Sequence, residues 1–391
     1  MRLIPKISAF ALGISLAYGG MPAHAAGELV LGYTMAKTGP YVSLAIGNEI
    51  AADIAVEEVN SKGGIDGKKL VLAKFDSGGD PKAAVTAVRR FAQDQKALAV
   101  IGPFSSSECT VAFPAGESEG IVQTSMSSSA PNLTKGFSFA FRNTVDEGKV
   151  IAAVMRTMEA KNLPAKNVAI AYAVDDAVSK SIGTKVLPAV FANRDVKETV
   201  DFKVKAFDLS SQVSQLVRSK PDVIGMGANP EAGVKLAVEL HRQGYGGRLI
   251  GGTTVADPDL PKRMAPAGEG MMIGTTYHPD VSERAAKFAK AYAERAKAAG
   301  FERLEPNQMD ASTYDIVLMY AEAIRNAKVS GDPANLAKDR AAIRDYLVSM
   351  KAFQGVEGDI RFDQDRDSVK PIYIIEAKAG AWHLVDTHGT N

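Results

Sequence analysis

The sequence predicts an α/β protein with two similar lobes, each built on a parallel sheet. The chain has 391 residues, which is more than one typical core accommodates. Short apolar strand segments alternate with amphipathic helical segments, a pattern typical of parallel strands joined by right-handed crossovers. The same pattern restarts after Phe141, so we expect a second unit of the same kind.

The first lobe opens with two strand and helix pairs. Ile50 and Ile54 lie about one helical turn apart, and Asp80 followed by Pro81 is a typical helix start. The predicted elements are strands at Leu29–Tyr33 and Leu70–Phe75 and helices at Gly47–Ser61 and Pro81–Asp94.

Two serine-rich turns follow the next two predicted strands, Ala97–Ile101 and Ile121–Thr124, with Ser107–Ser118 as the crossover helix between them. Ligands of open α/β sheets bind outside the carboxyl ends of the strands, and both turns lie at that edge. Their hydroxyls and free N–H groups predict a cradle for an anion. The alternative is ordinary loop chemistry, since serine is common in turns.

The second lobe is predicted from the pattern after Phe141. Three later helices lack strong intervening strands, and we assign them mostly to the first lobe. The tail from Phe353 has the Gly and Asp turns of antiparallel strands, and we expect it to return to the second lobe. In order, we predict a helix at Glu147–Ala160, a strand at Val168–Ala173, a helix at Lys180–Ala192, a strand at Val223–Met226, a helix at Glu231–Gln243, strands at Leu249–Gly251 and Met271–Thr275, and the late helices Ser282–Ala298, Gln308–Asn326 and Leu336–Met350.

The first 25 residues have the pattern of a secretory signal peptide. Arg2 and Lys6 precede an apolar run, and small residues at Ala23 and Ala25 form a cleavage site, so we predict cleavage after Ala25. The alternative, a buried N-terminal helix, is disfavoured because the run is short and Pro22 follows it. No cysteine lies at the cleavage site, so we expect no lipid anchor.

Composition excludes several function classes. The 46 basic and 45 acidic residues nearly balance, and loss of Arg2 and Lys6 changes the net charge from +1 to −1, so we expect no nucleic-acid partner. Cys109 is the single cysteine, so no internal disulfide forms. The histidines lack ligand spacing, and we predict neither a metal site nor a cofactor; they are His24, His241, His278, His383 and His388.

Catalytic signatures are missing from the sequence. It contains no GxSxG, no phosphate loop ending in GK[ST], no HExxH and no GxGxxG. Asp175 and Asp176 are adjacent carboxylates that usually point apart, and Glu57 and Glu58 fit a solvated helix face. We therefore expect a protein that is not an enzyme.

Asp146 adds an acidic group near the serine turns. Hydrogen bonds to a charged group are worth about 1.5–3 kcal/mol each, so three or four serine donors offset the desolvation of one ligand carboxylate. Asp146 could then face a cation or hydroxyl of the ligand. The alternative is a helix N-cap, since Asp146 and Glu147 open a predicted helix, and the two roles are compatible.

Seven short stretches, taken in order, resemble one family: the periplasmic solute-binding proteins of ABC importers related to the leucine, isoleucine and valine binding proteins. The resemblance covers nearly all of the chain after the leader. The stretches are TGPY from Thr38, NSKGGIDGKKL from Asn60, FDSGGDPKAAV from Phe75, IGPFSSSE from Ile101, SSSAPNLT from Ser127, FRNTVDEG from Phe141 and FQGVEGDIRFD from Phe353.

The resemblance implies roles for particular residues. Ser106, Ser127 and Ser129 match positions that hold the ligand's carboxylate, and Asp146 matches an acid that meets its amino group. A tyrosine and a glutamate of the amino acid binders are replaced by Ala177 and Thr253. An ammonium group would lose partners there, so a standard amino acid becomes less favoured as the ligand.

Other departures from the family concern the disulfide and the apolar wall. The positions of the family's disulfide match Gly79 and Ser105, so that bond is absent. The stretch GPFSSSECTVAFPAGE looks more like members that bind aromatic or other hydrophobic acids. Apolar walls for such a ligand would come from Tyr41, Leu44, Phe104 and Met309, although simple core packing is the alternative.

The resemblance also implies the overall organisation and partners. We expect Rossmann-like lobes of the type 1 periplasmic binding fold, joined by three hinge crossovers, with residues 27–145 and 277–351 in the first lobe and 146–276 and 352–391 in the second. We expect a periplasmic monomer that carries a small carboxylate to an ABC permease and its ATPase at the inner membrane. The alternatives are an exported ligand sensor of the same fold and a secreted serine hydrolase that uses Ser105 to Ser107.

Overall fold

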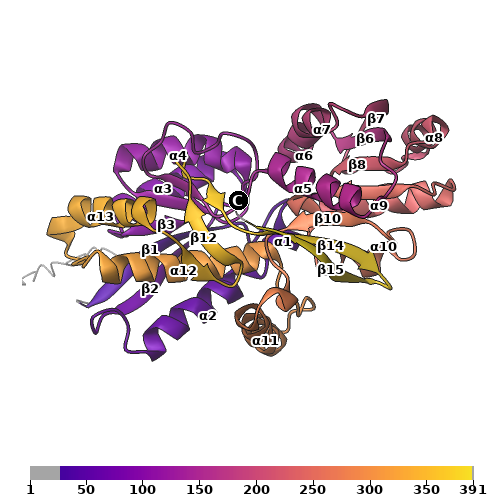
Figure 1. Ribbon diagram of the computed structural model, residues 1–391. Coiled ribbons are helices and arrows are strands. Elements are labelled where there is room, and N and C mark those ends of the chain that lie inside the picture. Colours follow the sequence, from indigo (N-terminus) through magenta and orange to yellow (C-terminus); the bar gives the residue numbers. More distant parts are fainter. Residues whose placement is uncertain (1–26, 390–391) are drawn as a thin grey trace, which may run out of the picture.

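The computed structural model describes residues 27–389. The predicted signal peptide and His24 lie outside the described residues. Two sheets organise the described chain, and Figure 1 shows them side by side with helices packed around each. A third, small sheet packs against the core of the first sheet and its helices. Both sheets are flanked by helices, so the predicted α/β class is confirmed.

The first sheet has five parallel strands in the order β2-β1-β3-β4-β5. The strand and helix alternation predicted for this part of the chain is confirmed. Its elements are β1 (Glu28–Met35), α1 (Val42–Ala45), α2 (Asn48–Ser61), β2 (Lys69–Asp76), α3 (Pro81–Gln93), β3 (Ala99–Ile101), α4 (Ser106–Glu119), β4 (Val122–Ser125) and β5 (Ala140–Arg142).

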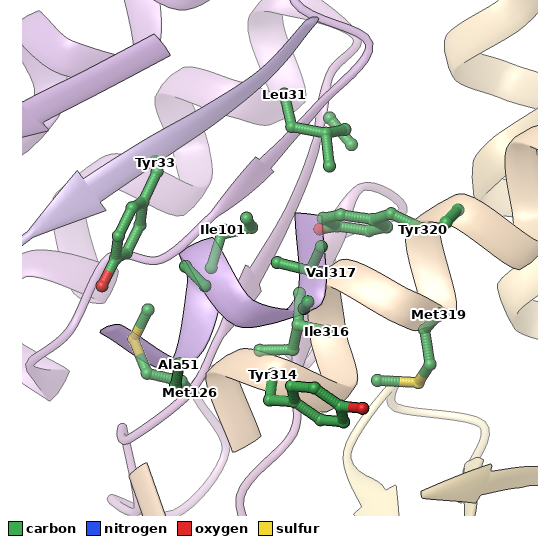
Figure 2. Packing of buried hydrophobic residues seen from close by; sticks show 14 of the residues in the cluster. Leu31, Tyr33, Ala51, Ile101, Met126, Tyr314, Ile316, Val317, Met319 and Tyr320 are labelled. Carbon is green, nitrogen blue, oxygen red and sulfur yellow. The ribbon is translucent and has the colours of Figure 1, made fainter. Parts of the chain in front are cut away.

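Two late helices, α12 (Gln308–Asn326) and α13 (Leu336–Ser349), pack against this first sheet, and a third, α11 (Glu283–Ala298), packs on α2. Figure 2 shows apolar side chains of α12 packed against residues of β1, β3 and α2. The Tyr320 hydroxyl of α12 donates to the carbonyl of Val100 at 2.9 Å and lies 2.7 Å from Thr124 Oγ1. Chain segments more than 200 residues apart therefore share one core.

The second sheet has seven strands in the order β15-β14-β10-β9-β8-β6-β7, and the strands from β10 to β7 run parallel. Of the last two strands of the chain, β14 pairs with β10 in antiparallel fashion, and β15 pairs in the same way with β14. Its elements are α5 (Glu147–Ala160), β6 (Asn167–Ala173), α6 (Ala177–Ser181), η1 (Ile182–Val186), α7 (Leu187–Val190), β7 (Asp195–Phe202), α8 (Ser210–Ser219), β8 (Val223–Gly227), α9 (Pro230–Arg242), β9 (Arg248–Gly251), η2 (Thr253–Val255), α10 (Leu260–Met264), β10 (Met272–Thr275), β14 (Ile372–Lys378) and β15 (Ala381–His388).

Residues 353–369 form a separate three-stranded antiparallel sheet of β11 (Phe353–Gly355), β12 (Gly358–Phe362) and β13 (Ser368–Val369). Phe353 and Ile360 pack into the first lobe's core. The tail therefore divides between the two sides: only its last two strands join the second sheet, whereas we expected all of it there. The division of the whole chain into two lobes at set residues stays a prediction.

Two elements between α7 and β8 escaped the sequence analysis, namely β7 and α8. β7 is an edge strand, and most of its side chains are at least partly exposed and polar, so no apolar run marks it. α8 buries only Val213 and Leu216, one turn apart, which is a weak helical signal.

Three crossovers connect the two sides of the molecule, and they meet at one buried ion pair. Lys370 Nζ lies 2.6 Å from Glu357 Oε2, and both side chains are fully buried. Glu357 also accepts hydrogen bonds from Asn143 Nδ2 at 2.9 Å and from Thr276 Oγ1 at 2.5 Å. Asn143 precedes α5 and Thr276 follows β10, so each crossover contributes a partner.

A second carboxyl, Asp315 of α12, lies beside this pair. It accepts the backbone N–H groups of Val356 at 2.9 Å and of Glu357 at 3.1 Å. Burial, together with the charge of Glu357, raises the pKa of Asp315. The three crossovers are therefore bound both to each other and to the first lobe's core helix.

Lys370→Met would leave the Glu357 carboxyl buried without its cation. Removal of one partner from a buried ion pair costs about 3–5 kcal/mol, so we expect the free energy of unfolding to fall by that amount. Urea denaturation measures it. The double variant K370M/E357M should recover most of the loss. K287M, which removes the exposed Lys287–Glu283 pair, should change it by less than about 1 kcal/mol. A K370M protein as stable as the K287M control would contradict this account.

Candidate functional site

The candidate site is a cavity between the carboxyl ends of parallel strands from both sheets. β3 and β4 of the first sheet end just before the two serine turns, and β6, β8 and β9 of the second sheet end just before the facing wall. Ligands of open α/β sheets bind at this edge. The cavity is lined by Tyr41, Leu44, Phe104, Ser105, Ser106, Ser127, Ser129, Asp176, Val178, Ser179, Asn229, Thr253, Thr254 and Met309.

The cavity is small. Its volume is about 40 Å³, on a measure by which one water molecule needs roughly 10–15 Å³. Hydroxyl groups dominate its polar lining, and one carboxylate, that of Asp176, is among the residues that line it. As it stands, the cavity has room for about three water molecules. The chemistry of its lining, with hydroxyls on some walls and apolar side chains on another, matches a molecule with a polar end and an apolar body.

The first serine turn is built by a helix cap. Ser105 begins α4 with a reciprocal pair of bonds: its Oγ accepts the Glu108 N–H at 3.2 Å, and its own N–H donates to the Glu108 carboxylate at 2.8 Å. Glu108 is itself buried and accepts from Ser77 Oγ at 2.5 Å. This cap places Ser106 in the first turn of the helix, at the cavity wall.

The second serine turn is held by a buried arginine. Arg142 of β5 is fully buried, and its Nη1 donates to the carbonyl of Ala130 at 2.5 Å. Asp367 balances its charge through two short contacts. The Ala130 N–H donates to Ser106 Oγ at 3.3 Å and so joins the two turns. The guanidinium therefore supports the turn from behind and leaves neutral hydroxyls at the cavity.

The facing wall is built from helix caps of the second sheet. Asp176 caps α6 by accepting the Ser179 N–H at 2.8 Å, and Asn229 caps α9 by accepting the Ala232 N–H at 3.0 Å. Ser179 Oγ and Thr254 Oγ1 are buried and have no hydrogen-bond partner among residues 27–389. Unpaired hydroxyls at a cavity wall are available to a ligand.

Apolar side chains of the first lobe close one side of the cavity. The Tyr41 and Phe104 rings lie 5.7 Å apart in a tilted arrangement. Asn307, which caps α12, donates from Nδ2 to the Leu44 carbonyl at 2.8 Å, and this bond brings Leu44 next to Met309. Burial, with the charge of Asp176, raises the pKa of Tyr41 to about 12. Tyr41 is therefore a neutral phenol at physiological pH.

The structure brings eight of the ten residues predicted from the sequence into the cavity lining: Ser106, Ser127, Ser129, Thr253, Tyr41, Leu44, Phe104 and Met309. The other two lie elsewhere. Ala177 is exposed at the start of α6, while its neighbours Asp176 and Val178 line the cavity.

Asp146 lies outside the cavity lining, so the expectation that it faces the ligand is corrected. Its Oδ1 caps α5 by accepting the Gly148 N–H at 2.8 Å, and its Oδ2 lies 3.7 Å from Arg142 Nη2. It lines a separate depression along α5 and η1 rather than the cavity. The capping alternative is thus the role that the structure supports.

Six lining residues were not predicted to bind the ligand: Ser105, Asp176, Val178, Ser179, Asn229 and Thr254. Two of them had usable signals. Asn229-Pro230 is a typical helix start immediately after a predicted strand, and Asp176 follows the strand at Val168–Ala173 in the same way. Helix starts that follow parallel strands lie at the same edge of the sheets as the serine turns, so this pattern places both residues near the cavity.

Other chemistry has little support at this cavity. No histidine of the described chain lines it, so its serines have no imidazole base in contact. Within residues 27–389, no cluster of three or more His, Cys, Asp or Glu side chains is arranged to hold a metal ion. None of the helices in that range combines the length and apolar character needed to cross a membrane.

Comparison with known proteins finds relatives along nearly the whole chain. A family model described as periplasmic binding protein matches residues 28–381. An amino acid binding protein of Pseudomonas aeruginosa is 28% identical over 82% of this chain and 84% of its own length. A Leu/Ile/Val-binding protein homolog of Brucella abortus is 27% identical over 94% of both chains.

Solved structures share the fold. The substrate-binding protein of a branched-chain amino acid transporter from Streptococcus pneumoniae, in complex with isoleucine, matches with a TM-score of 0.80 at 21% identity and covers 93% of this chain and 99% of its own. A solute-binding protein from R. palustris, in complex with benzoate, matches with a TM-score of 0.77 at 18% identity and covers 93% and 97%. The type 1 periplasmic binding fold predicted from the sequence is confirmed.

Ser179→Ala should stabilise the ligand-free protein, because it removes a buried hydroxyl that has no partner. We expect the free energy of unfolding to rise by about 1 kcal/mol. Ser105→Ala, at a neighbouring lining position, should lower it by about 1 kcal/mol, since it removes a helix cap. Urea denaturation of both variants without added ligand measures the two effects. The opposite order of stabilities would show that Ser179 is satisfied and Ser105 is not a cap.

Proposed function

Because this chain belongs to the periplasmic binding protein family, we propose that it captures a small carboxylate outside the cytoplasm and delivers it to an ABC permease with an ATPase. The relatives named above are binding proteins rather than enzymes, which supports this proposal. The predicted signal peptide supports secretion to the periplasm, and we propose that the carrier is a monomer. The observation that carries the proposal is the cavity with its two linked serine turns.

The serine turns are suited to the carboxylate end of such a ligand. Ser106, Ser127 and Ser129 line the cavity, and the first two have no carboxylate among their hydrogen-bond partners. Hydrogen bonds from neutral donors to a carboxylate are worth about 1.5–3 kcal/mol each. Three of them offset much of the cost of moving one carboxylate from water into the cavity.

The other end of the ligand meets a less charged environment than in an amino acid site. Thr253 stands where the resemblance places a glutamate, and Ala177 is exposed. Asp176 is the carboxylate in the lining, and its Oδ2 is already engaged by the Ser179 N–H. Apolar residues occupy the adjoining wall. We therefore propose a hydrophobic or aromatic acid as the ligand in preference to a standard amino acid.

Closure of the lobes around the ligand follows from the architecture. The cavity draws on both sheets, and the crossovers meet at one cluster around Glu357. Rotation about three crossovers is a hinge motion that opens the cavity without breaking either sheet. A closed, ligand-bound form is then the form presented to the permease.

Ser129→Ala should weaken binding of a carboxylate without unfolding the protein. Loss of one hydrogen bond to a charged group predicts about a 10- to 100-fold higher Kd, measured by isothermal titration calorimetry. Ser211→Ala, on the exposed side of α8, is the matched control and should leave Kd unchanged. Equal affinities of S129A and wild type would reject the assignment of this turn.

Benzoate and 4-methylpentanoate, which is leucine's skeleton without the amino group, should stabilise the protein at least as well as leucine. A ligand at 100 times its Kd stabilises by about 2.7 kcal/mol, which a thermal-shift measurement detects. Asp176→Asn should leave these two acids bound. Stabilisation by leucine alone, lost in D176N, would identify Asp176 as the ammonium partner and overturn the preference for hydrophobic acids.

A further inference from the structure

Glu147 is a buried carboxyl directly behind the cavity wall. It is 1% exposed. Thr253 Oγ1, from the second sheet's side of the cavity, donates to its Oε2 at 2.6 Å. Its backbone N–H donates to the Ser129 carbonyl at 3.3 Å, so the residue is also tied to the second serine turn. Glu147 thus touches one cavity-lining residue on each wall.

Gly252 lacks a side chain, and the Glu147 carboxyl occupies the space that a side chain there would fill. A Cβ added at Gly252 would lie 1.9 Å from Glu147 Oε1, so a side chain at that position would displace the carboxyl. Oε1 is buried and has no hydrogen-bond partner among residues 27–389. The position therefore holds a carboxyl with one satisfied oxygen and one unsatisfied oxygen.

No cation neutralises this group from the elements packed around it. Ser129 from the first lobe, Gly252, Thr253 and Thr254 from the second, and Ile151 on its own helix are uncharged. The charged neighbour is Asp146, another acid. Burial raises the pKa of Glu147 to about 7, although the hydrogen bond from Thr253 acts to lower it. The neutral, protonated carboxyl is therefore well populated at neutral pH.

We propose, on the basis of the proposed function, that Glu147 is a positioning residue for the ligand's carboxylate: when it is protonated, its otherwise unpaired Oε1 donates to the hydroxyl of the adjoining Ser129 and directs that hydroxyl's hydrogen toward the ligand. A serine hydroxyl has one hydrogen to donate. Ionised Glu147 would accept that hydrogen in competition with the ligand's carboxylate. Protonated Glu147 reverses the direction of the bond, so Ser129 serves the ligand alone.

The proposal links ligand binding to a proton. A bound carboxylate and an ionised Glu147 would place two negative charges on either side of one hydroxyl, so the complex favours the protonated acid more strongly than the free protein does. Binding above pH 7 must then take up a proton. The Kd for a carboxylate rises with pH there, by up to about tenfold per pH unit.

The first arm of the test needs no ligand. A carboxyl whose pKa is raised in the folded state makes the protein lose stability as pH rises from its unfolded-state pKa, about 4.3, to its folded-state value. The amide of Glu147→Gln is never charged. The melting temperature of this variant minus that of wild type should therefore increase from pH 5 to pH 7 and stay at the higher value at pH 8.5. Glu294→Gln, an exposed glutamate of α11, should follow wild type throughout. Equal profiles of E147Q and wild type would overturn the proposal.

The second arm uses benzoate and leucine as probes in calorimetric titrations at pH 6.5, 7.5 and 8.5. Wild type should bind benzoate with a Kd that rises about tenfold per pH unit above pH 7.5 and with proton uptake, seen as a dependence of the heat on buffer. E147Q should bind within a few-fold of wild type at pH 6.5 and lose most of the pH dependence, because its amide still donates to Ser129. E147A should bind weakly at every pH.

Two results would separate the possible failures. Loss of leucine binding in E147Q with benzoate binding retained would show that Glu147 is an anionic partner of an ammonium group, and would overturn the proposal. If neither probe binds wild type at any pH, the proposed carboxylate function fails for these acids. The stability profile of E147Q then decides alone whether Glu147 is held protonated.

Discussion

The ion pair between Lys370 and Glu357 sets the relation between the two lobes, because each of the three crossovers contributes a group to it. Taking these charges out of water is expensive, and the cost is offset only when every remaining lone pair and proton is satisfied. Asn143, Thr276 and the Asn143 carbonyl supply those contacts. Displacement of any one crossover would break one of these contacts. The cluster therefore holds the three crossovers in a fixed arrangement, and this arrangement sets how the two walls of the cavity face each other.

The same residue types cap helices and line the cavity, and this overlap explains what the sequence could and could not predict. The serine turns were found because they follow two apolar strands, and the structure places them at one sheet edge. Asp146 was misplaced because an acid at a helix start fits both a cap and a ligand contact, and local pattern does not separate the two. Asp176 and Asn229 cap helices and also line the cavity, so a capping role does not exclude a binding role.

Contacts between residues far apart in the chain determine the environment of a buried polar group, and they cannot be predicted from the local sequence. Glu147 is adjacent to Asp146 and looks like a second acid in the first turn of a helix. Its character depends on Thr253 and Gly252, more than 100 residues further along the chain. Similarly, the pairing of Lys370 with Glu357 and Asn143 requires the three crossovers to meet, which no local signal indicates. The strands and helices could be predicted from apolar periodicity, while these buried polar groups could not.

The distribution of charge around the cavity bears on selectivity. Arg142 and Lys370 are buried near the site, yet Asp367 and Glu357 neutralise them, and both cations bind backbone carbonyls instead of lining the cavity. A free guanidinium in the wall would hold any small anion, phosphate included, through bidentate bonds. Neutral hydroxyls with one hydrogen each hold an anion only when several converge on it with suitable geometry. Arg142 therefore supports the second serine turn from behind, and discrimination between acids is left to the hydroxyls and to the apolar wall formed by Tyr41, Leu44, Phe104 and Met309.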